Sequence, residues 1–142
     1  MKKIILAVLT ILSLTMLRSQ TSDEAQIRGT LTDYIEGSSY NKVHQIKSAF
    51  AANATLYLNN KEGDFNVYTP EQYGDFFKNR EPGEFNGRVG EILDIDMVRD
   101  IATAKVEIVI SKTKARYIDL FLLKKIDGEA WRIISKTAAL SD

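Results

Sequence analysis

The sequence predicts an α+β fold, in which N-terminal helices pack on one side of a curved antiparallel sheet. Two observations lead to this prediction. Apolar residues at helical spacing come early in the chain, whereas segments of alternating apolar and polar residues fill its second half. Helices that are segregated from a run of consecutive strands are typical of α+β domains.

The first 19 residues are expected to be a secretory signal peptide. A short basic segment, Met1-Lys2-Lys3, precedes an apolar run of 14 residues from Ile4 to Leu17. This run is too short to cross a bilayer as a helix, although a retained anchor is the alternative. We therefore expect cleavage after Ser19, export to the periplasm or the outside medium, and no stable membrane insertion. Residues 20–142 are then expected to form a single domain.

Composition argues against several classes of function. The chain has no cysteine, so it can form neither a disulfide nor a thiolate nucleophile. Its 19 basic and 19 acidic residues balance, and nothing in this balance points to nucleic acid as a partner. The single histidine, His44, is expected at the surface. No ligand spacing accompanies it, so we expect no metal site and no cofactor.

Apolar residues at helical spacing predict the first two helices. The first begins at Ser22 or Asp23, either of which can cap a helix, and Gly37 is expected to end it. Its apolar face consists of Ile27, Leu31, Tyr34 and Ile35. The stripe of a short second helix consists of Val43, Ile46 and Phe50.

A small hairpin and a third helix are predicted next. Residues 54–58 and 65–68 favour two short strands joined by a turn. Thr69, Pro70 and Gln72 then indicate a helix start, with a threonine cap, a proline in the first turn and a glutamine that completes a capping box. The aromatic residues of this helix are Tyr73, Phe76 and Phe77.

Four long antiparallel strands are predicted in the rest of the chain. Residues 101–111 alternate cleanly between apolar and polar, and residues 130–137 follow an Asp127-Gly128 hairpin turn with Trp131, Ile133 and Ser135 alternating. The strand before these two is expected to be bent, and its apolar residues are Val89, Leu93, Ile95 and Met97.

The third of these strands, over residues 115–123, carries an ionisable group within an apolar run. Asp119 shares one face with Tyr117, Phe121 and Leu123. A carboxyl group there must be hydrogen-bonded, kept neutral by burial, or placed on the wall of a cavity. The opposite face carries Ile118, Leu120 and Leu122. Because three helices cover only one side of the sheet, we expect this outer face to form a homodimer.

With these elements in place, the chain resembles the nuclear transport factor 2-like (NTF2-like) superfamily, which has a cone-shaped fold. Within that superfamily it is most similar to the SnoaL-like proteins and to those described as "putative lumazine-binding". The resemblance covers nearly all of residues 20–142 and implies a cavity between helices and sheet. The segments that carry it are residues 27–37, 49–50, 92–95, 101–106, 117–120 and 131–136.

The superfamily also includes ketosteroid isomerases, polyketide cyclases and scytalone dehydratase. The isomerases use a tyrosine of the first helix, a neutral aspartic acid on a late strand and a separate aspartate as base. Tyr34 and Asp119 fall at the first two of these positions. Residues 56–58, Leu-Tyr-Leu, occupy the position expected for the base, so a base would have to come from elsewhere, such as Glu62 or Asp64.

Three functions follow from this sequence, and the first is the leading hypothesis. It is an exported protein without catalytic activity that holds a small apolar or aromatic molecule, carrying a carbonyl, in the cone cavity. Tyr34 and Asp119 would make the polar contacts. The walls would be Tyr117, Phe121 and Trp131, with Phe76 or Phe77 as a lid.

The other two functions would use the chain differently. An isomerase, cyclase or dehydratase would use Tyr34 and Asp119 as donors to an oxyanion. A homodimeric interaction module would act mainly through the outer sheet face. A structural role for Asp119, joining the first helix to the sheet, is the alternative to all of these roles.

Overall fold

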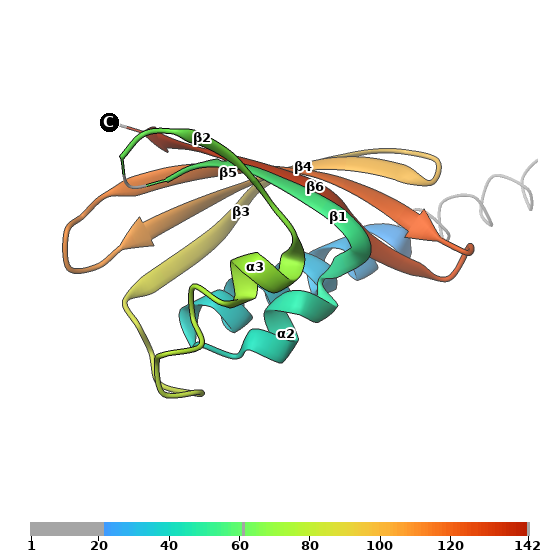
Figure 1. Cartoon of the computed structure of the whole chain (residues 1–142). Coiled ribbons are helices and arrows are strands. Elements are labelled where there is room, and N and C mark those ends of the chain that lie inside the picture. The colour runs from blue at the N-terminus through green and yellow to red at the C-terminus, as the bar shows by residue number, and fades with distance from the viewer. Residues whose placement is uncertain (1–21, 61, 142) are drawn as a thin grey trace, which may run out of the picture.

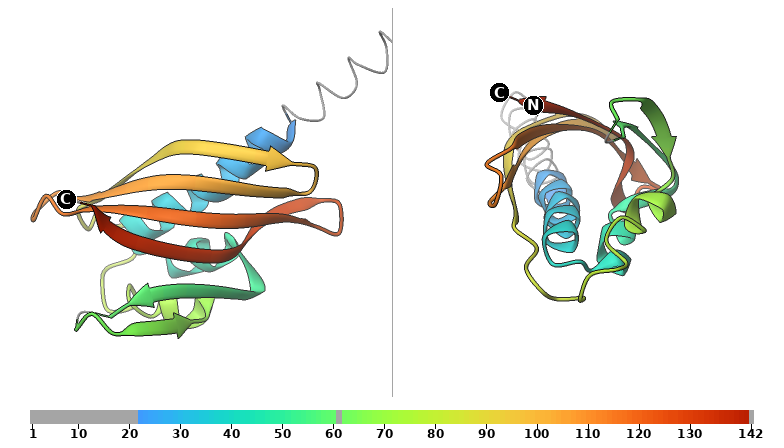
Figure 2. Two further views of the ribbon diagram at one scale, coloured as in Figure 1. Left: turned by 90° about the horizontal axis from the view of Figure 1, so that it is seen from above. Right: turned by 60° about the vertical axis from the view of Figure 1, so that its left-hand side comes forward.

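The structure is a computed structural model that describes residues 22–60 and 62–141. A six-stranded sheet curves around the helices, which lie on its concave side (Figure 1 and Figure 2). The strand order is β2-β1-β6-β5-β4-β3. The predicted α+β architecture is confirmed, but the sheet is mixed, because β1 pairs in parallel with β6. The expected signal peptide lies outside the described residues.

The described residues form three helices and six strands. Residues 22–39 are helical and are called the N-terminal helix below. The other helices are α2 (Val43–Ser48) and α3 (Pro70–Gly74). The strands are β1 (Phe50–Asn59), β2 (Phe65–Tyr68), β3 (Arg88–Val98), β4 (Ile101–Ile110), β5 (Arg116–Ile126) and β6 (Ala130–Ser141). None of the described helices is both long enough and apolar enough to span a membrane.

The N-terminal helix supplies the centre of the core. Its residues Ile27, Leu31 and Tyr34 are fully buried against the inner face of the sheet, as their spacing predicted. Gly90 on β3 allows the close approach of this helix, because a Cβ atom there would lie 2.7 Å from Cγ2 of Ile35. The burial of these large side chains against the sheet provides most of the stabilisation of the helix.

Several predicted boundaries are wrong. Ser22 and Asp23 are both helical, and the N-terminal helix continues past Gly37 to residue 39. Gly37 is required by packing instead, since a Cβ atom there would lie 2.7 Å from the backbone nitrogen of Ile46. Phe50 belongs to β1, which starts four residues earlier than predicted.

The start of α3 agrees with its sequence signal. The Thr69 hydroxyl accepts a hydrogen bond from the Gln72 backbone N–H, and the Gln72 side chain accepts one from the Thr69 N–H. The helix ends at Gly74, however, so Phe76 and Phe77 lie in the turn that follows it. The two rings are therefore not part of α3, and of the two only Phe77 is buried.

Two β-bulges change which residues face the core. In β3 the register shifts between Ile92 and Asp94, so Arg88 lies on the inner face with Ile92, while Val89 and Leu93 are 52% and 46% exposed. A bulge reverses the alternation of all residues on one side of it. Val89 and Leu93, two of the apolar residues of the expected bent strand, therefore lie outside the core.

The second bulge lies in β6. Leu122 of β5 pairs with Ser135 and Leu123 pairs with Ile133, which leaves Ile134 as the extra residue. The predicted alternation of Trp131, Ile133 and Ser135 therefore fails after Ile133. Lys136 turns inward and is buried instead of Ser135.

A buried carboxylate fastens the N-terminal helix to the hairpin between β5 and β6. Asp23 accepts hydrogen bonds on Oδ1 from Lys125 Nζ at 2.7 Å and from Trp131 Nε1 at 3.1 Å. The hydrogen bond from Lys125 lowers the pKa of Asp23 below its ordinary value, although burial acts in the opposite direction. Folding is therefore favoured by the charged form of this group.

We expect Asp23→Ala to lower the free energy of unfolding by about 1–2 kcal/mol at neutral pH, because two hydrogen bonds to a charged acceptor are lost. The native pKa of Asp23 lies below the unfolded value of 3.8, so its contribution is complete above pH 3.8 and disappears as the pH falls through the native pKa. Urea unfolding at several pH values measures this loss. Glu24→Ala, which removes an exposed pair with Arg28, is the control. A difference between wild type and Asp23→Ala that persisted at low pH would contradict this account.

Candidate functional site

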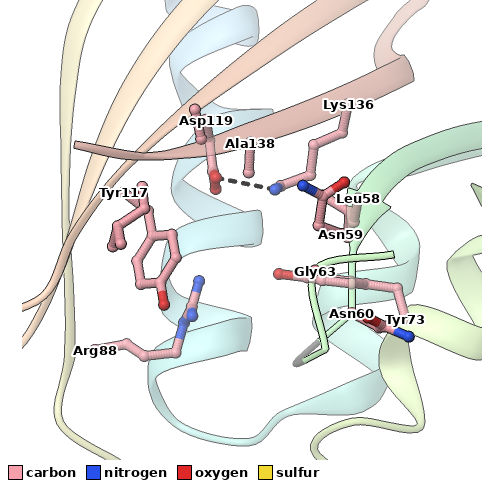
Figure 3. Close-up of a pocket in the computed structure, with 12 residues that line it drawn as sticks. Leu58, Asn59, Asn60, Gly63, Tyr73, Arg88, Tyr117, Asp119, Lys136 and Ala138 are labelled. Atoms are coloured by element: carbon pink, nitrogen blue, oxygen red, sulfur yellow. Dashed lines mark ion pairs between the residues drawn. The ribbon is translucent and has the colours of Figure 1, made fainter. Parts of the chain in front are cut away.

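A cavity of about 590 Å³ lies between the inner face of the sheet and the hairpin of β1 and β2 (Figure 3). Its volume falls within the range of small-molecule sites. The lining combines charged, polar and apolar side chains from five segments of the chain. These residues are Leu58, Asn59, Asn60, Gly63, Tyr73, Arg88, Tyr117, Asp119, Lys136, Ala138, Ala139 and Leu140.

A buried ion pair lies on the sheet wall of this cavity. Asp119 of β5 and Lys136 of β6 are joined by a contact of 2.9 Å between Oδ1 and Nζ, and each side chain is only 3% exposed. The second carboxylate oxygen, Oδ2, accepts a hydrogen bond of 2.6 Å from the hydroxyl of Tyr34. Both oxygens therefore have donors, as a buried carboxylate requires.

Aromatic rings surround the Lys136 ammonium. Its Nζ lies 5.7 Å from the ring centroids of Tyr34 and Tyr73 and 5.8 Å from that of Phe121, distances at which cations and ring faces attract. The hydroxyls of Tyr34 and Tyr73 are 3.0 Å apart. The ion pair is thus enclosed on its inner side by side chains from the N-terminal helix, α3 and β5.

Tyr34 acts as a donor in this network. Burial raises the pKa of Tyr34 well above its usual range, and the negative charge of Asp119 acts in the same direction. The hydroxyl therefore keeps its proton and donates a hydrogen bond to the carboxylate. This differs from the expected pair of donors, because Tyr34 donates to Asp119 and not toward a ligand. The contact joins the first helix to the sheet, which was the structural alternative.

Arg88 is the second cation of the cavity. It begins β3, and its Nε is fully buried without a hydrogen-bond partner among the described residues. Its guanidinium carbon lies 5.8 Å from the centroid of the Phe77 ring. Burial by itself would lower the pKa of Arg88, but the electrostatic influence of Tyr73, Tyr34 and Asp119 raises it overall. Arg88 therefore carries a permanent positive charge.

A network of asparagines holds the chain that leads into Arg88. The Asn86 side chain accepts a hydrogen bond of 3.1 Å from the Arg88 backbone N–H and donates to the Ser38 carbonyl at 2.7 Å. It also donates to Asn41, whose own amide donates to the carbonyls of Glu81 and Glu84. The loop before β3 is thereby fixed to the end of the N-terminal helix, so the start of β3 has a defined position.

The residues predicted as ligand contacts do not all meet in one place. Tyr117 and Asp119 line the cavity. Tyr34 and Phe121 lie behind its wall, with ring centroids 5.0 Å apart. Phe76 and Phe77 line a separate hollow of about 270 Å³, which shares Tyr73 and Arg88 with the main cavity. Trp131 is buried away from the cavity and donates a hydrogen bond to Asp23.

The other residues considered from the sequence lie outside the cavity lining. His44 is exposed on α2, as predicted. Neither Glu62 nor Asp64 lines the cavity, although Gly63 between them does. The Asp64 carboxylate accepts a hydrogen bond of 3.2 Å from the side-chain amide of Asn60. Within residues 22–60 and 62–141, no cluster of three or more histidine or acidic side chains is placed to hold a metal ion.

Both cations of the site were absent from the residues predicted to form it. Lys136 and Arg88 were not among the candidate site residues, because each follows or precedes a β-bulge that determines which face of its strand it occupies. The one available signal was period-two spacing from Ile92 back through Gly90 to Arg88. No comparable signal marks Lys136, since its orientation depends on where the extra residue of β6 falls.

Comparison with known proteins places this chain in a family. The model of the family described as "Putative lumazine-binding" matches residues 22–138, which is most of the chain. A search of curated proteins gave no significant match. The match confirms the resemblance drawn from the sequence.

Solved structures show the same fold. An NTF2-like protein of unknown function from Shewanella baltica has a TM-score of 0.73 and 21% identity, with 86% of this chain and 96% of that chain covered. One from Methylobacillus flagellatus has a TM-score of 0.72 and 26% identity, with coverage of 85% and 94%. A ketosteroid isomerase-like protein from Erwinia carotovora atroseptica has a TM-score of 0.60 and 14% identity, with coverage of 83% and 95%.

We expect Asp119→Asn and Lys136→Met each to lower the free energy of unfolding by about 3–5 kcal/mol, because each leaves one buried group without its partner. The double variant should cost less than the sum of the two single variants, since it leaves no uncompensated charge. Urea unfolding of the four proteins gives this coupling. Asp75→Asn, which removes an exposed contact with Lys78, should have little effect. Additive effects of the two substitutions would show that the pair is not coupled.

Proposed function

We propose, from the premise that the chain belongs to the family described as "Putative lumazine-binding", that the cavity binds a small planar molecule. The observation that carries the proposal is the cavity itself, which combines buried charged groups with apolar walls. Cavities of this kind, with a few convergent polar groups, are typical of small-molecule sites. The basic and apolar N-terminal segment adds export to the proposal, so the ligand would be met outside the cytoplasm.

Binding without catalysis is favoured by the way in which the acid is used. Both oxygens of Asp119 accept from protein donors, Tyr34 and Lys136, so the acid is not free to take a proton from a substrate. Asp119 is also the only carboxylate among the described residues that line the cavity. An isomerase-type reaction would need a further base, and fold similarity to an isomerase-like protein does not supply one.

A homodimer through the outer sheet face remains part of the proposal. Leu120 and Leu122 of β5 are 46% and 40% exposed on the convex side of the sheet, which the described helices leave uncovered. Polar neighbours on β4 and β6, such as Lys105 and Thr137, flank them. This mixture of apolar and polar side chains resembles a protein interface with a small apolar centre.

Lumazine, the ligand named in the family description, is the first probe for the cavity. We expect saturable binding to one site per chain in a fluorescence titration. Ala138→Phe should weaken binding at least about tenfold, which is about 1.4 kcal/mol, because the added ring occupies the cavity beside Asp119. Glu129→Phe, at the exposed turn between β5 and β6, is the matched control. The proposal fails if neither lumazine nor related planar heterocycles bind, or if Ala138→Phe binds as well as wild type.

The oligomeric state can be measured by light scattering of the purified protein. We expect a dimer at micromolar concentration, and we expect Leu120→Glu to convert it to a folded monomer by placing a charge in the apolar centre of the interface. Phe65→Glu removes an exposed apolar side chain from β2 and should leave the dimer intact. A monomeric wild-type protein would exclude this part of the proposal.

A further inference from the structure

We propose that Arg88 binds the anionic group of the ligand, so that the cavity selects planar carboxylates over their neutral analogues. This inference rests on the proposed function and specifies the chemical class of the ligand. Three features of the described residues support it: the charge balance of the cavity, the unpartnered Nε of Arg88, and the direction in which that side chain points.

The first feature is an uncompensated positive charge. The cavity lining contains three charged side chains, Arg88, Lys136 and Asp119. Lys136 and Asp119 neutralise each other across a contact of 2.9 Å. Among the described residues, Arg88 forms no ion pair with a carboxylate. The cavity therefore carries one net positive charge, which favours an anionic ligand.

The second feature is the incomplete bonding of Arg88. Its Nε is buried and has no partner among the described residues. A buried donor without a partner costs stability, and a permanently charged guanidinium cannot avoid this cost by losing its proton. Nε itself is covered, whereas the side chain as a whole is half-buried and lines the cavity. A carboxylate would therefore bind the part of the guanidinium that faces the cavity, and the planar fork of donors suits its two oxygens.

The third feature is geometry. Arg88 points into the same space as the hydroxyl of Tyr117 and the ion pair of Asp119 and Lys136 (Figure 3). The Tyr117 hydroxyl provides a second donor toward an anion held there. Leu58, Ala138 and Leu140 contribute apolar surface to the same cavity, against which a planar body can lie. Arg88 also borders two smaller hollows of about 270 and 350 Å³.

Matched pairs of ligands separate the charge from the shape. We would titrate the protein with 2-naphthoate and 2-naphthamide, and with benzoate and benzamide, by calorimetry. In the wild-type protein each carboxylate should bind at least about tenfold more tightly than its amide, as expected for hydrogen bonds to a charged group. Arg88→Gln should remove this preference, and Arg88→Lys should keep only part of it, because a lysine is a point charge without the fork of donors.

Two further measurements make the result specific to Arg88. Arg28→Gln removes an equal charge from an exposed position on the N-terminal helix and should leave the preference unchanged. In the wild-type protein, the Nε–H resonance of Arg88 should shift on addition of 2-naphthoate and remain in place with 2-naphthamide. This second measurement requires no variant, so it decides the matter even if Arg88→Gln does not fold.

The possible outcomes distinguish the two proposals. Equal affinity for carboxylate and amide, or a preference that survives in Arg88→Gln, would overturn the role of Arg88 and leave the binding function standing. Failure of every probe to bind, lumazine included, would overturn the proposed function and this inference with it. A carboxylate preference that is lost with Arg88 and accompanied by the shift of its Nε–H resonance supports the inference.

Discussion

The buried ion pair of Asp119 and Lys136 is the contact on which the arrangement of this protein depends. Two charges that are each almost completely removed from water must be placed accurately, because their attraction offsets their lost hydration only in good geometry. Tyr34 of the N-terminal helix donates a hydrogen bond to Asp119, and the hydroxyl of Tyr73, from α3, is hydrogen-bonded to that of Tyr34. The position of both helices on the sheet is therefore coupled to one pair of charges, which also forms a wall of the cavity.

The sequence predicted those features of the fold that local patterns encode. The apolar face of the first helix, the capping box at Thr69 and the inward position of Asp119 each depend on residues close together in the chain, and each was found. The predicted end of the first helix was wrong because Gly37 is required for close packing against Ile46, a contact that local sequence does not show. Likewise, the parallel pairing of β1 with β6 is a long-range contact that no local pattern contains.

The candidate site was only half predictable, for a physical reason. Both of its cations lie in bulged strands, and a single extra residue exchanges the inner and outer faces of everything beyond it. The inward position of Lys136 was not predicted, because simple alternation assigned Ser135 to the interior. The same bulge places Lys136 beside Asp119 as its partner. Asp119 is therefore part of an ion pair and accepts hydrogen bonds. In the isomerase sites used for comparison, the corresponding acid is a donor.

The position of β6 has a consequence for how the chain must fold. This final strand pairs with β5 on one side and with β1 on the other, so it joins the early hairpin to the rest of the sheet. During synthesis, β1 can pair with β2 early, but its other partner, β6, is made only when almost the whole chain is complete. Such distant pairing slows folding and delays the closing of the sheet. The hairpin of β1 and β2 therefore depends on the last strand of the chain for its place in the sheet.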